Sequence, residues 1–186
     1  MKALLQNLSL IYPISPELND YLMEKLKLVM LPKKGFLLKE GRICKNIYFI
    51  NKGLARCFYI KEGKEVSSWF MKEGDLIISV ESYFNQQPSH ENIQAIEDCE
   101  LISASFEDLK FIYYKYPEFN FIARVLTEKY YTLSEQRLFS LRMQRASERY
   151  AHLMNHSPEI IQRVPSTFIA SYLGITLETL SRIKHV

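Results

Sequence analysis

The last stretch of the chain, residues 164–186, constrains the fold most strongly, because two short amphipathic segments meet there at a single glycine. Apolar residues recur at helical spacing on one narrow face of each segment, at Ile169, Ala170 and Leu173 and then at Leu180 and Ile183. Gly174 can take the left-handed conformation that ends a helix, and Thr176 can cap the next one. The pattern predicts a helix-turn-helix.

The outer face of the second predicted helix carries three kinds of hydrogen-bonding group, on Glu178, Ser181 and Arg182. Reading base edges in DNA requires donors and acceptors of this kind. Amide groups that point outward beside the cap at Thr176 also suit a phosphate. The alternative is a small helical subdomain whose polar face is merely solvated, and the residues alone leave it open.

Upstream of this region, glycines punctuate short segments rich in aromatic and β-branched residues. Five of the six glycines fall between residues 35 and 74. The segments have strand length, at residues 36–38, 47–50, 54–60, 66–70 and 76–80, with one or two more in 93–104. Turns are expected at Glu62-Gly63 and at Glu73-Gly74. This punctuation predicts an antiparallel barrel or roll.

Helices are predicted on both sides of the roll. Residues 16–27 show helical spacing, with Ser15 as the cap. Residues 106–114 begin a helix that Pro117 interrupts, residues 118–141 can form one long helix, and residues 145–155 form another. An exposed second apolar stripe on the long helix would be poorly soluble, so we expect it to pair with the same helix of a second chain. Burial against its own domain is the alternative.

The predicted chain is therefore α+β and has three parts: a β-roll effector domain at residues 1–117, a dimerisation helix at 118–141 and a helix-turn-helix domain at 142–186. This order resembles the Crp/Fnr superfamily of bacterial transcription regulators. So does the recognition-helix pattern E-T-x-S-R-I, formed by Glu178, Thr179, Ser181, Arg182 and Ile183. Leu177 stands where Crp-type proteins carry an arginine, which makes the pattern more similar to the Fnr branch.

The resemblance implies a double-stranded β-helix, or jelly roll, of the cyclic-nucleotide-binding type, followed by a winged-helix type of DNA-binding domain. It implies a homodimer that reads an inverted-repeat operator in double-stranded DNA and that works with RNA polymerase. It makes Arg182 a donor to guanine, Glu178 an acceptor from cytosine and Ser181 a neighbouring base contact, roles that suit these groups. It also makes three hydroxyls phosphate contacts, those of Ser166, Thr176 and Thr179.

Cyclic-nucleotide-binding members hold the cyclic phosphate with an Arg-Ser pair and the ribose with a Gly-Glu pair. An ungapped alignment places Val80 at the glutamate, His90 at the arginine and Glu91 at the serine, and Ile78 and Ser134 are further candidates for an effector pocket. A shift of one residue would change these assignments, but the sequence has no arginine between Arg56 and Arg124. We therefore expect cyclic AMP to bind poorly and any effector to be another small molecule. The alternatives are a vestigial pocket and a His90 that is only a surface residue.

Charge and cysteine content indicate where DNA would bind and in which compartment the protein works. Residues 142–186 hold six Arg and Lys against three Asp and Glu, whereas residues 1–141 hold eighteen of each, so the excess positive charge lies where DNA is expected. Three distant cysteines suit a reducing compartment. The resemblance to the Fnr branch implies an iron–sulfur cluster only where cysteines gather near the N-terminus; none precedes Cys44, so neither a cluster nor another cofactor is expected. Neither a membrane span nor a signal peptide is indicated, which predicts a cytoplasmic protein.

Two other classes of function were compared with DNA binding. An enzyme is not expected, because a cupin-type metal site needs several histidines and His90 is the only one in the first 141 residues. Motifs for a nucleophile or a phosphate-binding loop are also missing from the sequence. A ligand-sensing or dimeric interaction module that no longer binds DNA stays open, because the sequence stops three residues after Ile183, where relatives continue into a longer helix and a wing.

Overall fold

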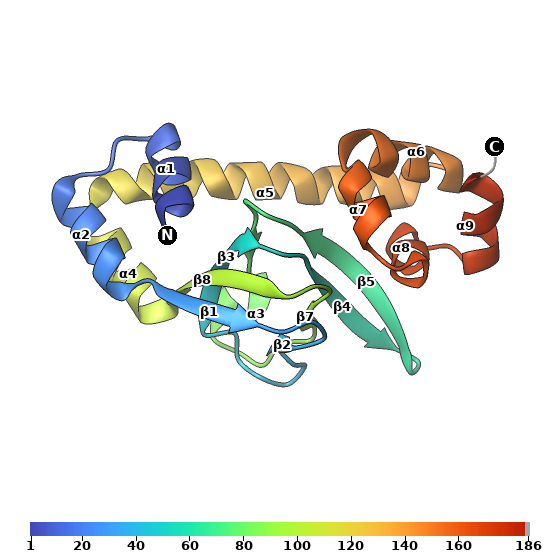
Figure 1. Cartoon of the computed structure of the whole chain (residues 1–186), viewed down its shortest axis with the longest axis horizontal. Coiled ribbons are helices and arrows are strands. Elements are labelled where there is room, and N and C mark those ends of the chain that lie inside the picture. Colours follow the sequence, from blue (N-terminus) through green and yellow to red (C-terminus); the bar gives the residue numbers. More distant parts are fainter. Residues whose placement is uncertain (185–186) are drawn as a thin grey trace. The chain divides into compact units, whose positions relative to one another are not determined.

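The computed structural model describes residues 1–184 as an α+β chain with the element order shown in Figure 1. The helices are α1 (Lys2–Ile11), α2 (Pro16–Lys25), α3 (Val80–Asn85), α4 (Phe106–Lys115), α5 (Pro117–Met143), α6 (Ala146–His156), α7 (Pro158–Arg163), α8 (Ser166–Leu173) and α9 (Leu177–Lys184). The strands are β1 (Lys27–Leu31), β2 (Phe36–Leu38), β3 (Asn46–Lys52), β4 (Ala55–Lys61), β5 (Lys64–Met71), β6 (Leu76–Ile77), β7 (Asn92–Ala95) and β8 (Cys99–Ser105).

Two compact units make up the chain. The first consists of Met1–Arg56 with Met71–Glu128, and the second of Cys57–Phe70 with the residues from Lys129 onward. The boundary between them therefore falls inside α5 and inside the β4–β5 hairpin. The predicted division into residues 1–117, 118–141 and 142–186 was based on the expected functions of the three parts and not on how compactly they pack. It stays a prediction.

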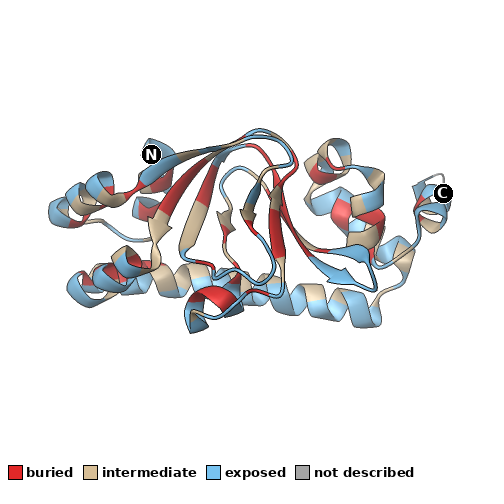
Figure 2. Cartoon of the chain, turned by 90° about the horizontal axis from the view of Figure 1, so that it is seen from below, coloured by how far each residue is buried: buried red, intermediate tan, exposed pale blue. Residues whose placement is uncertain are grey.

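The strands form a roll of two four-stranded sheets, in the orders β1-β8-β3-β6 and β2-β7-β4-β5. The pairings of β8 with β1 and β3, of β3 with β6 and of β2 with β7 are antiparallel. The strands contribute buried side chains to the core of the roll, among them Ile50, Ile77 and Leu101, which have no exposed surface. Figure 2 shows buried residues along the strands and also on the helices. The predicted β-roll is confirmed.

Helices α2 and α4 and the start of α5 pack together in the first unit. The Ser15 hydroxyl accepts from the Leu18 amide at 3.3 Å, which confirms the predicted cap, and donates to the Glu118 carboxylate at 2.6 Å. The Tyr21 ring stacks on Phe111 with centroids 5.0 Å apart. These contacts join the N-terminal segment to the helices that follow the roll.

The sequence prediction of a strand over residues 76–80 is wrong in its second half. Strand β6 ends at Ile77, and Val80 begins the short helix α3. Ser79, in an extended conformation, occupies the N-cap position, and Glu81 lies in the first turn, where a negative charge favours a helix. Helices α1 and α7 and strand β1 were not predicted.

Candidate nucleic-acid interface and effector site

The two C-terminal helices, α8 and α9, meet at the predicted turn in the second unit. Gly174 has φ 66° and ψ 37°, and its amide donates to the carbonyls of Ala170 and Ser171. The Ile175 amide donates to the Ala170 carbonyl at 3.0 Å. This pattern of hydrogen bonds is a Schellman-type helix end. It requires a left-handed backbone conformation at Gly174, which glycine adopts without strain.

Helix α9 begins with the side-chain cap that the sequence predicts. The Thr179 amide donates to the Thr176 hydroxyl at 3.2 Å, and the Leu180 amide donates to the Thr176 carbonyl at 3.0 Å. The Thr176 and Thr179 hydroxyls are also hydrogen-bonded, at 3.1 Å. The cap fixes the first turn of the helix, which is the part that a groove-binding helix presents to base edges.

The inner faces of both helices are buried. Ile169 and Leu173 on α8 and Leu180 on α9 are at most 1% exposed, and Ala170 is 3% exposed. Glu178, Ser181 and Arg182 on α9 are all exposed. The structure thus brings the three predicted base-reading residues to one solvent-facing side of a helix anchored by its other face.

The carboxylate of Glu178 is held in its ionised form. A hydrogen bond from Thr176, a backbone amide contact and the nearby Arg182 guanidinium lower the pKa of Glu178 below its ordinary value. An ionised carboxylate accepts hydrogen bonds only. Near neutral pH, Glu178 is therefore suited to a donor such as an amino group.

The predicted phosphate contacts lie near cationic side chains. The Lys184 ammonium donates to the Ser166 hydroxyl at 3.0 Å, which links the end of α9 to the start of α8. The Arg182 guanidinium donates to the Thr179 hydroxyl at 3.4 Å. Ser166 and Thr179 are half-buried, and Thr176 is exposed. None of the three residues is fully buried, so each can be reached from solvent. Their role in binding phosphates stays a prediction.

Helix α8 is fixed by two arginines that sequence reasoning missed. The Arg137 guanidinium lies 3.6 Å from the centre of the Tyr172 ring and donates to the Tyr172 carbonyl. The Arg149 guanidinium donates to the Leu173 carbonyl at 2.9 Å. Both arginines donate to carbonyls in the last turn of α8. Carbonyls at this end of a helix have no hydrogen-bond donor within the helix, and their partial negative charge favours cations.

The β4–β5 hairpin also contacts α8 in the second unit. The Ser67 amide donates to the Ser171 hydroxyl at 2.9 Å, and that hydroxyl donates to the Glu65 carbonyl at 3.0 Å. The Phe70 and Tyr172 rings are 5.0 Å apart. Strand β5 is therefore hydrogen-bonded to the first helix of the helix-turn-helix.

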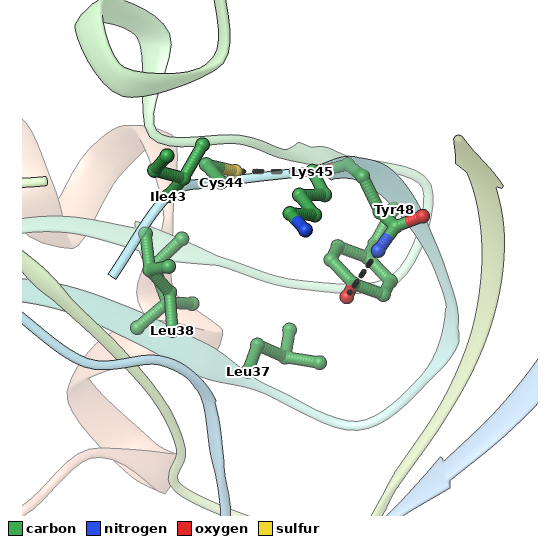
Figure 3. Close-up of a pocket in the computed structure, with 8 residues that line it drawn as sticks. Leu37, Leu38, Ile43, Cys44, Lys45 and Tyr48 are labelled. Carbon is green, nitrogen blue, oxygen red and sulfur yellow. Dashed lines mark hydrogen bonds between the residues drawn. The ribbon is translucent and has the colours of Figure 1, made fainter. Parts of the chain in front are cut away.

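A cavity of about 200 Å³ lies in the first unit (Figure 3). Its walls are mainly apolar, and Lys45, Asn46 and Tyr48 add polar groups at one side; the full lining is Leu37, Leu38, Ile43, Cys44, Lys45, Asn46, Tyr48 and Ile93. The Asn46 amide donates to the Tyr48 hydroxyl at 3.4 Å. Burial raises the pKa of the Tyr48 phenol, which keeps it protonated near neutral pH.

The predicted effector residues do not line this cavity. Val80 is 59% exposed at the start of α3, His90 is exposed, and Ile78 and Glu91 are half-buried. Ser134 belongs to the second unit, where its hydroxyl donates to the Tyr130 carbonyl at 2.9 Å. The assignment of these five residues to an effector pocket stays a prediction.

Two serines, one position before Val80 and His90, are among the buried polar side chains of this segment, together with Ser82 and Asn92. Ser79 and Ser89 are each 3% exposed, and their hydroxyls are 3.0 Å apart. The one-residue shift considered in the alignment would have identified them. Neither is charged, and the buried guanidinium of the roll is that of Arg56, which donates to Gln94 at 2.8 Å.

The roll matches a known domain family. Residues 28–116 match the family model of the cyclic nucleotide-binding domain. A comparison with curated proteins finds no significant match. The roll is therefore similar to the cyclic nucleotide-binding domain.

Solved structures share the fold of nearly the whole chain. A CooA variant from Carboxydothermus hydrogenoformans is 20% identical, with a TM-score of 0.70, over 92% of this chain and 79% of that protein. FixK2 from Bradyrhizobium japonicum is 22% identical, with a TM-score of 0.70, over 86% of this chain and 83% of FixK2. A protein of Eubacterium rectale assigned to the Crp/Fnr family is 16% identical, with a TM-score of 0.72, over 92% of this chain and 82% of that protein.

The solved structures share the fold that the sequence predicts for the chain, and the family model matches its roll. The α+β architecture, with a β-roll, a long helix and C-terminal helices, is that of these structures. No helix within residues 1–184 is both long and apolar enough to span a bilayer.

Proposed function

We propose that this chain is a DNA-binding transcription regulator of the Crp/Fnr type and not an enzyme. The observation that carries the proposal is the exposure of Glu178, Ser181 and Arg182 on α9 while its opposite face is buried at Leu180. A capped helix with this polarity fits the major groove, where a guanidinium reads guanine and a carboxylate reads cytosine. Ser166, Thr176 and Thr179 would position the helix against phosphates.

The exposed side of α5 supports the proposal of a homodimer. Tyr131 is 66% exposed and Leu138 is 42% exposed, and their seven-residue spacing puts both on one stripe. Pairing with the same stripe of a second copy would cover them and present two recognition helices to an inverted repeat. In the cytoplasm, RNA polymerase would be the partner on DNA, as expected for this family.

The test of DNA binding is selection from a random duplex library, followed by gel shift at several salt concentrations. We expect an inverted-repeat sequence to be enriched and to bind at least about a thousandfold more tightly than random DNA. Affinity should fall steeply as salt rises, because phosphate contacts release counterions. An absence of both enrichment and salt-dependent binding would favour the alternative, an interaction module that does not bind DNA.

The roll would sense a small molecule other than cyclic AMP. Where Val80, His90 and Glu91 were expected, the buried polar side chains are those of Ser79, Ser82, Ser89 and Asn92, which are all neutral and offer no charge to a cyclic phosphate. The cavity beside Lys45 and Tyr48 offers an apolar site with a cation at its edge. A thermal-shift screen tests this, and a clear stabilisation by cyclic AMP would contradict it.

A further inference from the structure

Helix α6 carries a histidine pair that the proposed DNA interface does not use. His152 and His156 are one helical turn apart, and both are exposed. Their rings are stacked, with centroids 4.1 Å apart and planes inclined by 25°. Two imidazoles are therefore held side by side on one face of a helix in the second unit.

The hydrogen bonding of His156 determines which of its nitrogens is available. Its Nδ1 lies 2.9 Å from the His152 carbonyl oxygen. Because a carbonyl oxygen only accepts, Nδ1 carries the proton, and Nε2 of the neutral ring keeps its lone pair. Histidines that bind metals commonly donate their other ring N–H to a backbone carbonyl in this way.

The end of α6 also favours a cation near the histidine pair. His156 is the last residue of α6, where the exposed carbonyls of a helix end attract positive charge.

We propose that His152 and His156 together bind one divalent transition-metal ion of the zinc, nickel or copper class. Imidazole nitrogens suit these ions. Within residues 1–184 no group of three or more metal-binding side chains occurs, so water would fill the remaining coordination positions. The proposal does not depend on DNA binding.

The cysteines of the chain are poor competitors for the ion. Cys44, Cys57 and Cys99 are all buried, and burial raises the pKa of the Cys44 and Cys99 thiols. A buried thiol in its protonated form is a weak ligand, because the thiolate is the species that binds metals.

The experiment is calorimetric titration of the full chain, prepared without a polyhistidine tag, with nickel chloride and with zinc chloride. We expect one ion per chain in the wild type and binding that is about tenfold weaker or more in His152→Ala and in His156→Ala. The double variant should lose the site. His90→Ala is the matched control, since it removes an exposed histidine that lies outside α6.

Two outcomes would overturn the proposal. One is a wild type that takes up no ion at about 100-fold excess over the protein, and the other is a double variant that binds as tightly as the wild type. A second measurement identifies the ligand atoms: on zinc addition, the ¹⁵N signal of His156 Nε2 and that of one ring nitrogen of His152 should shift. A shift in one ring only would also contradict the proposal.

Discussion

At the scale of single residues, Thr176 does two things at the turn between α8 and α9. Its hydroxyl accepts from the Thr179 amide, which caps α9, and its hydrogen bond to Glu178 helps to keep that carboxylate ionised. The same side chain therefore supports both the start of the recognition helix and the charge state of one of its proposed base-reading groups.

Thr176→Ala should raise the pKa of Glu178 toward its ordinary value and destabilise the chain by about 1 kcal/mol, the usual value of a lost cap. Because the folded-state pKa of Glu178 is lowered, its stabilising contribution is present above the unfolded-state pKa and is lost as pH falls through the folded-state pKa. An NMR titration of the Glu178 carboxyl carbon measures this pKa in the wild type and in the variant. An unchanged midpoint in the variant would show that Thr176 does not act on Glu178.

Gly174 shows how a single position joins two elements. Its φ of 66° is costly for any residue with a Cβ, although an added Cβ would meet only Leu141, at 3.8 Å. The cost of a substitution there is therefore backbone strain and not steric overlap.

Gly174→Ala should lower the free energy of unfolding by about 1–2 kcal/mol, whereas Gly174→Asn should cost less, because asparagine enters the left-handed region more readily. Urea denaturation of the two variants measures the difference. Equal effects from Ala and Asn would show that strain at this residue does not control the turn.

At the scale of elements, the sequence predicted what depends on local spacing. Strand β2, the helix break at Pro117, the cap at Ser15 and the left-handed glycine were all predicted correctly, because each follows from a few adjacent residues. Among the site residues, Glu178, Ser181 and Arg182 were predicted to share one exposed face, and the structure places them there.

The contacts that hold α8 could not be predicted in the same way. The Ser67–Ser171 hydrogen bond joins residues 104 positions apart, and the Arg137–Tyr172 contact joins residues 35 apart. No periodicity links such pairs, since they depend on how whole elements pack. The buried Ser79 and Ser89 were missed because the register of a loop is not fixed by the spacing of apolar residues.

Ser171→Ala should loosen the β4–β5 hairpin from α8, because it removes one acceptor and one donor at once. We expect the free energy of unfolding to fall by about 1 kcal/mol and hydrogen exchange at the Ser67 amide to become faster. Ser147→Ala, at an exposed position on α6, is the matched control. Unchanged exchange at Ser67 in Ser171→Ala would contradict the importance of this contact.

At the scale of the whole molecule, reading an inverted repeat requires two copies of the chain. Leu138→Glu places a charge on the exposed stripe of α5 and should convert a dimer to a monomer in analytical ultracentrifugation, with little change in the stability of the chain. Met154→Glu, at a residue that is 47% exposed on α6, controls for adding a charge at an exposed apolar position. A wild type that is already monomeric, or a Leu138→Glu dimer, would contradict pairing through this stripe.

The proposed reading of bases by α9 depends on Arg182. It is tested most directly by competition gel shifts of Arg182→Ala and Arg182→Lys with the selected operator and with random DNA. Arg182→Ala should weaken the free energy of binding to the operator by about 1–3 kcal/mol and that to random DNA by much less. The preference for guanine at one position should also be relaxed. Arg182→Lys should retain the affinity for random DNA but not the guanine preference, because lysine cannot make the two-pronged contact. An equal loss on operator and random DNA for Arg182→Ala would contradict the claim.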